Sequence, residues 1–180
     1  MINRDDPKIV VLWRDLIKGA EDRCEVNLQH EIESYLVQLL IRFTSHTEIG
    51  QEIMATSFLD AINEQQAPCR YSLAHVGDQC LLLSGLFPGI AERRHVKISY
   101  FVDLGRSAYA TISDTTSDLY GSLALQFVVL TDILQSVNES KTLMPMEAYD
   151  LWQELGSKRA FKILQEQTKC GIPVTRKLFE

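Results

Sequence analysis

The chain has 180 residues, of which 46% are hydrophobic and 23% charged, and its formal net charge is −6. This length favours one domain with a full hydrophobic core, and the composition excludes a disordered or fibrous class. The acidic excess argues against general nucleic-acid binding, which normally requires a basic face.

Neither cysteine spacing nor apolar runs indicate export or membrane insertion. No two of the four cysteines have the close spacing of a zinc site or a disulfide framework, so reduced thiols are expected. The first residues are too acidic for a signal peptide, and polar residues interrupt the longest apolar stretch, 119–134. These features predict a cytoplasmic protein that does not cross a membrane.

Apolar residues recur at steps of three and four along most of the chain, which predicts helices. Residues 97–102 are rich in β-formers, but the helical spacing continues through Gly105 and Ile112, so this stretch is also predicted as helix. A strong break is expected at Phe87–Gly89, because proline lacks an N–H group and glycine tolerates left-handed geometry. The predicted helices cover about 7–21, 28–44, 49–63, 71–86, 96–113, 117–138 (capped by Thr116 or Ser117) and 146–169.

No internal repeat or long linker divides the chain. We therefore predict an all-α fold in which residues 1–180 form a single bundle-like domain of about seven helices. The predicted fourth and fifth helices, 71–86 and 96–113, differ from the others because each carries an interior glycine among small residues.

Gly77 and Gly105 suggest a close crossing of these two helices. Glycine costs about 1 kcal/mol in a helix interior relative to alanine, and close backbone approach would explain that cost. Each glycine precedes a charge, Asp78 or Arg106, so the crossing predicts a buried ion pair. The alternative is that Asp78 faces water and Arg106 pairs locally with Asp103.

The same two helices supply a candidate polar centre, for which a structural role is favoured over a catalytic one. Its members are polar or aromatic residues that the crossing could bring together: His75, Asp78, Tyr100, Arg106 and Tyr109.

This segment resembles a family of uncharacterised bacterial proteins. The resemblance lies in Gly77-Asp78, the run Gly85-Leu-Phe-Pro88, Arg93-Arg94, Tyr100-Phe101 and the run Leu104-Gly-Arg-x-Ala-Tyr109. It covers about a fifth of the chain, from His75 to Tyr109. The resemblance implies a bacterial, cytoplasmic protein and no particular chemistry.

Motifs for specific chemistry are largely missing from the sequence. Glu92-x-x-His95 matches half of a di-iron motif, but the second Glu-x-x-His is absent. There is no GxGxxG, no phosphate-binding loop and no GxSxG. An axial histidine has no spacing signature, so His30 and His75 leave haem binding open. We predict no metal and no cofactor.

Two functions therefore compete. The first is a helical interaction or regulatory module that binds a protein partner or self-associates, in keeping with its many apolar helix faces. The second is a small-molecule-binding protein or enzyme whose polar centre lies between the fourth and fifth helices, since bundle interiors often hold ligands. Whether the chain is an enzyme stays open.

Overall fold

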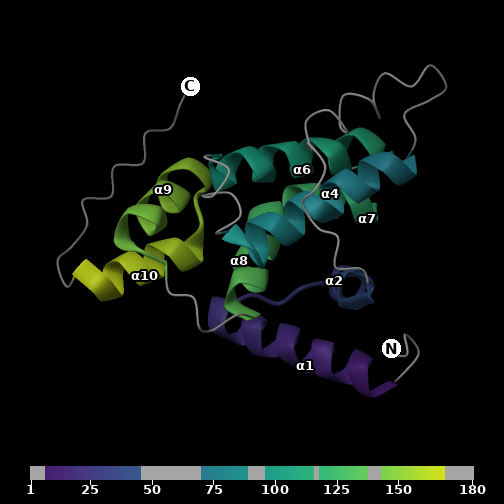
Figure 1. Cartoon of the computed structure of the whole chain (residues 1–180), viewed down its shortest axis with the longest axis horizontal. Helices are drawn as coiled ribbons and strands as arrows, with labels where there is room; N and C mark the ends of the chain where they lie inside the picture. The colour runs from purple at the N-terminus through teal and green to yellow at the C-terminus, as the bar shows by residue number, and fades with distance from the viewer. Residues whose placement is uncertain (1–6, 46–69, 89–95, 116–117, 138–142, 169–180) are drawn as a thin grey trace.

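The computed structural model describes residues 7–45, 70–88, 96–115, 118–137 and 143–168, and these residues form an all-α fold. Eight helices and no strand occur within these ranges, which confirms the predicted fold class. Figure 1 shows them in place. They are α1 (Pro7–Cys24), α2 (His30–Ser45), α4 (Arg70–Gly85), α6 (Ile98–Ile112), α7 (Leu119–Leu125), α8 (Phe127–Val137), α9 (Pro145–Leu155) and α10 (Lys158–Thr168).

Four predicted helices correspond to α1, α2, α4 and α6, and their ends differ by three residues or fewer. The stretch 97–102 is helical as predicted, because α6 begins at Ile98. The predicted helix over 49–63 lies outside the described residues.

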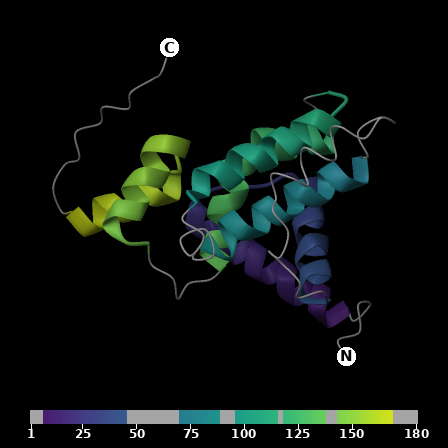
Figure 2. The same cartoon turned by 45° about the horizontal axis from the view of Figure 1, so that its top comes forward.

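Helix α4 runs through the middle of the bundle. Every residue from Val76 to Gly85 is buried, and all of them except Asp78 and Gln79 are apolar or small. Its most extensive contact is with α6, which lies beside it in both views (Figures 1 and 2), and α8 packs against another side. The main hydrophobic core therefore surrounds α4.

The prediction of one helix over 117–138 is wrong. The chain forms α7 and α8, which meet at Gln126 with a bend of 75°. Helix α7 packs on α6 and α2, whereas α8 packs on α1 and α4. The bend lets each half bury its apolar face against different neighbours, and no proline or glycine marks it in the sequence.

The prediction of one helix over 146–169 is also wrong. Helix α9 ends at Leu155. The residue after it, Gly156, is the C-cap: it adopts left-handed geometry with φ 72° and donates its N–H to the Trp152 carbonyl at 2.9 Å. Ser157 then caps α10. The two helices lie side by side at one end of the molecule (Figure 2) around a small core of their own, formed by Leu143, Ala148, Leu151, Ala160 and Leu164.

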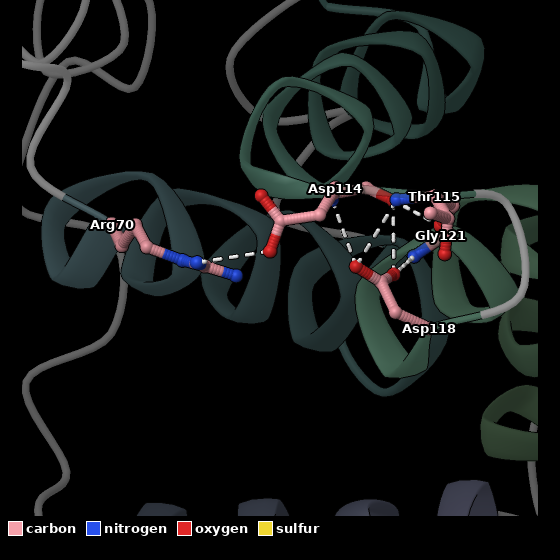
Figure 3. A network of polar contacts seen from close by, with 6 residues as sticks. Arg70, Asp114, Thr115, Asp118 and Gly121 are labelled. Carbon is pink, nitrogen blue, oxygen red and sulfur yellow. Dashed lines mark hydrogen bonds and ion pairs between the residues drawn. The ribbon is translucent and has the colours of Figure 1, made fainter.

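Asp118 organises the turn between α6 and α7, as Figure 3 shows. Its carboxylate accepts hydrogen bonds from the backbone N–H groups of Gly121 at 2.7 Å and Asp114 at 2.8 Å. These bonds, above all that from Gly121, lower the pKa of Asp118 to about 2. Asp118, and not the predicted Thr116 or Ser117, is the N-cap of α7. Arg70 binds Asp114 at 3.2 Å and so ties the start of α4 to this turn.

Within the described part of the chain, no single helix has both the length and the apolar character needed to cross a membrane. Helices α7 and α8 have that length and character only when they are taken together, as a pair bent by 75°.

Candidate functional site

A buried carboxylate, Asp78, is the centre of a polar network between α2, α4 and α6. Tyr35 donates its hydroxyl to Asp78 Oδ1 at 2.6 Å, and Tyr109 donates to the same oxygen at 2.7 Å. Arg42 Nη2 lies 3.1 Å from Oδ2 and forms the ion pair. Three donors from two other helices therefore compensate the charge of one buried carboxylate.

Local sequence explains how each donor reaches Asp78. Tyr35 and Arg42 are seven residues apart on α2, so they lie on one face of that helix two turns apart. The Arg42 guanidinium lies 5.9 Å from the centre of the Tyr35 ring, close enough for a cation–π contact. Tyr109 comes from α6 and is fully buried.

Gly77 makes room for the Tyr109 ring. A Cβ atom at position 77 would lie 2.4 Å from Tyr109 Cε1, far inside normal contact distance. Gly105 is similarly close to both α8 and α4, because a Cβ there would lie 2.4 Å from Phe127 Cζ and 2.9 Å from Cys80 Cβ. The prediction that both glycines lie in one close helix contact is confirmed, and they are offset along it, since Gly77 faces Tyr109 and Gly105 faces Cys80.

Burial and hydrogen bonding oppose one another at Asp78. Burial raises the pKa of its carboxyl group, while the hydrogen bonds from Tyr35 and Tyr109 and the charge of Arg42 lower it; the balance is a raised pKa. Burial, reinforced by the nearby Asp78, also raises the pKa values of Tyr35 and Tyr109 well above the ordinary value for tyrosine. Both tyrosines therefore stay protonated at neutral pH and serve as donors. This arrangement stabilises the three-helix junction.

The predicted pair of Asp78 with Arg106 is not formed. Arg106 is exposed, and no hydrogen bond or ion pair joins it to Asp78 in the described structure. The reason is geometric: Gly105 faces α4, and the next residue lies about 100° further around the helix. The described residues also contain no ion pair between Arg106 and Asp103, so the local alternative is not formed either.

Of the five residues predicted as a polar centre, the structure joins only Asp78 and Tyr109 by a hydrogen bond. His75 is exposed on α4. Tyr100 is 42% exposed in the first turn of α6, where its ring contacts Phe101 with 5.5 Å between ring centres. Sequence reasoning missed two residues of the network, Tyr35 and Arg42, which both lie on α2. The one available signal was a charge at position 42 inside a strongly apolar run.

Comparisons with protein-family models, curated proteins and solved structures give no match to this chain. The resemblance of residues 75–109 to a bacterial family stays a prediction.

A second polar cluster joins α8 to the start of α10 and was not predicted. Asp132 accepts a hydrogen bond from Ser157 Oγ at 2.6 Å and a longer one from the Arg159 backbone N–H at 3.5 Å. Ser157 Oγ in turn accepts from the Ala160 N–H at 3.0 Å. The first N–H groups of α10 are thus capped by side chains. Burial raises the pKa of Asp132, and the hydrogen bond from Ser157 opposes this shift.

Two adjoining cavities lie beside this cluster, with volumes of about 340 and 860 Å³. Both are lined by Cys24, Lys158 and Arg159. Burial raises the pKa of the Cys24 thiol, so it is not an activated nucleophile at neutral pH. Among the described residues, no group of three or more His, Cys, Asp or Glu side chains is placed to hold a metal ion.

Proposed function

We propose that this chain is a helical interaction module that self-associates through an apolar surface on α9. One observation carries the proposal: Met146, Tyr149 and Trp152 follow one another at steps of three residues on α9, the first two exposed and Trp152 half-buried against the small core of α9 and α10. Met146 is 73% exposed and Tyr149 is 40% exposed, although both are large apolar side chains. We call these three residues the α9 stripe.

The α9 stripe has the composition and order of a contact surface. Met, Tyr and Trp are enriched in protein interfaces, and single exposed apolar residues elsewhere need no such explanation. The Tyr149 and Trp152 rings are in contact, with 6.0 Å between their centres, and Trp152 also contacts Phe161 of α10 at 5.3 Å. These ring contacts restrict the Tyr149 and Trp152 side chains, which reduces the entropy that these two residues lose on binding.

The polar centre between α4 and α6 supports an enzyme less well. Both carboxylate oxygens of Asp78 already accept hydrogen bonds from the protein, and the tyrosines that bind them have raised pKa values. A group engaged in this way stabilises the fold and is poorly placed to exchange protons with a substrate.

Helix α1 offers a competing contact surface. Val11 and Leu12 are 53% and 57% exposed, and Leu16 is 36% exposed. These residues are aliphatic, whereas the α9 stripe has the aromatic and methionine content typical of interface cores. The α9 stripe is therefore the first surface to test.

The test is sedimentation velocity over a range of concentrations with matched variants. We expect the wild-type chain to sediment as a dimer or larger assembly and Tyr149→Glu to shift it toward monomer, because a buried carboxylate without a partner opposes association. Tyr71→Glu is the control, since Tyr71 is 79% exposed at the start of α4. A further variant, Leu12→Glu, reports on α1.

Three results would count against the proposal. A wild-type chain that is monomeric at its highest soluble concentration would refute self-association. Equal effects of Tyr149→Glu and Tyr71→Glu would remove the α9 stripe as the contact. Dissociation by Leu12→Glu alone would place the contact on α1. Circular dichroism of each variant separates loss of association from loss of folding. Bacterial origin and cytoplasmic location stay predictions.

A further inference from the structure

The smaller cavity, of about 340 Å³, lies where α6, α8 and the turn between α9 and α10 meet the end of α1. We call it the seam cavity. Its volume is within the range of small-molecule sites in proteins. Its walls divide into a basic part and an apolar part, and each part limits what could bind there.

Three cations line the seam cavity and one carboxylate opposes them. Arg106 comes from α6, and Lys158 and Arg159 come from the first turn of α10. The carboxylate is Asp132, whose oxygens are hydrogen-bonded to Ser157 and to the backbone of α10. Such an excess of positive charge is unexpected in a chain whose formal net charge is −6.

These cations have few partners within the described residues. Neither Arg106 nor Lys158 forms an ion pair there, whereas Lys97 and Lys162 bind Glu154 and Glu25. A bound anion would add negative charge to that of Asp132, which already opposes Arg159. Because α6, α8 and α10 enclose the cavity in part, the attraction between this anion and the cations would be somewhat stronger than at an open surface.

Arg159 gives the strongest indication of an anion. Its side chain is half-buried, and Nη1 donates to Gln135 Oε1 at 3.1 Å. Gln135 is itself held by a hydrogen bond from its Nε2 to the Ser84 carbonyl at 3.0 Å, which fixes the oxygen toward Arg159. A guanidinium group has five N–H donors, and no other side-chain donor of Arg159 has an acceptor in the described structure. A carboxylate or phosphate can bind two of these donors at once.

The backbone of α10 does not provide this anion site. Asp132 and Ser157 already accept hydrogen bonds from the first N–H groups of that helix. The side-chain cations would therefore have to hold the anion.

The other wall of the seam cavity is apolar. It would favour an anion with a hydrophobic body over a bare inorganic ion. The residues that form it are Val26, Leu125, Val128, Val129 and Leu155.

We propose that the seam cavity binds a small organic anion with an apolar body. Arg159 and Arg106 hold its carboxylate or phosphate group, and the valines of α8 contact its hydrocarbon part. This site is separate from the α9 stripe, and its test does not depend on self-association.

Isothermal titration calorimetry with a matched set of probes tests the proposal. Octanoate and octyl phosphate carry both an anionic group and an apolar chain, 1-octanol lacks the charge, and acetate and inorganic phosphate lack the chain. We expect octanoate, octyl phosphate or both to bind saturably, and the other three probes to bind at least about tenfold more weakly. The better of the two amphipathic probes identifies the anionic group.

Variants then locate the binding site. Arg159→Gln and Arg106→Gln should each weaken binding about tenfold or more, since a charge-assisted hydrogen bond is lost. Arg106 is exposed, so its variant keeps the test valid even if Arg159→Gln perturbs the fold. Arg70→Gln is the control, because Arg70 is exposed and binds Asp114 at the far turn. Unchanged binding in both test variants, or octanol binding as tightly as octanoate, would overturn the proposal. If inorganic phosphate bound as tightly as octyl phosphate, the proposed contact between the apolar wall and the hydrocarbon part of the ligand would be refuted.

Discussion

Replacing Gly105 with alanine tests the close packing of α6 against α8 and α4. An alanine Cβ at this position would lie 2.4 Å from Phe127 Cζ and 2.9 Å from Cys80 Cβ. Unstrained carbon atoms approach to about 3.5–4.0 Å, so the ring would have to move by about an ångström. Phe127 and Cys80 are both fully buried and have no open space into which to move.

Two opposing effects determine the size of the change. Alanine stabilises a helix interior by about 1 kcal/mol relative to glycine. Overpacking a core costs about 1–3 kcal/mol, and the upper end applies here because two buried groups are displaced. The expected net loss of stability is therefore about 2 kcal/mol. For a chain of this size it corresponds to a fall in Tm of roughly 4–8 °C.

Gly19→Ala is the matched control, measured by urea and thermal unfolding followed by circular dichroism. Gly19 lies within α1, and a Cβ there would meet only Arg23 Nη1, at 3.4 Å. This variant should gain up to about 1 kcal/mol, so the two identical substitutions should have opposite signs. If Gly105→Ala were as stabilising as Gly19→Ala, the close packing of α6 against Phe127 and Cys80 would be refuted.

Three further outcomes are expected in unfolding experiments. Tyr109→Phe removes a buried hydrogen bond to the Asp78 carboxylate and should lower the free energy of unfolding by about 1.5–3 kcal/mol. The control Tyr100→Phe, at an exposed position, should stay within about 0.5 kcal/mol of wild type. Equal effects of the two substitutions would contradict the hydrogen-bond network around Asp78. The lowered pKa of Asp118, about 2 against an ordinary 3.8, contributes stability above pH 3.8 that is lost as pH falls toward 2. Asp118→Asn should therefore be less stable than wild type at neutral pH, and this difference should shrink in acid; a constant difference would argue against the charge. Ser157→Ala removes the cap of α10 and should cost about 0.5–2 kcal/mol, and no loss would contradict capping.

Helical periodicity predicted the fold class because a helix requires only a local spacing of apolar residues. Four helices predicted from this spacing are present as α1, α2, α4 and α6. The break between α9 and α10 had a local signal in Gly156, but the apolar pattern on both sides continues at helical spacing. The bend at Gln126 had no such signal, since it results from the different neighbours of α7 and α8. Only the arrangement of the other helices determines that break.

Only part of the polar centre was predicted, because sequence signals are local and some of its residues come from a helix distant in sequence. The glycines correctly indicated that α4 and α6 pack closely, because glycine in a helix interior needs a compensating contact. The charged partner of Asp78, Arg42, lies on α2, which is distant in sequence, and residue spacing cannot identify such a partner. Proximity to the second glycine wrongly favoured Arg106, although its direction around the helix turns it away from α4.

Photo-cross-linking tests most directly whether the α9 stripe is a contact surface. Benzoylphenylalanine would replace Tyr149 in one sample and the exposed Tyr71 in another, and each sample would be irradiated at the same protein concentration. The proposed self-association predicts a covalent dimer from position 149, with the cross-linked peptide from a second copy of the chain, and little dimer from position 71. Equal dimer yields at the two positions, or no dimer from position 149, would contradict the proposed role of α9.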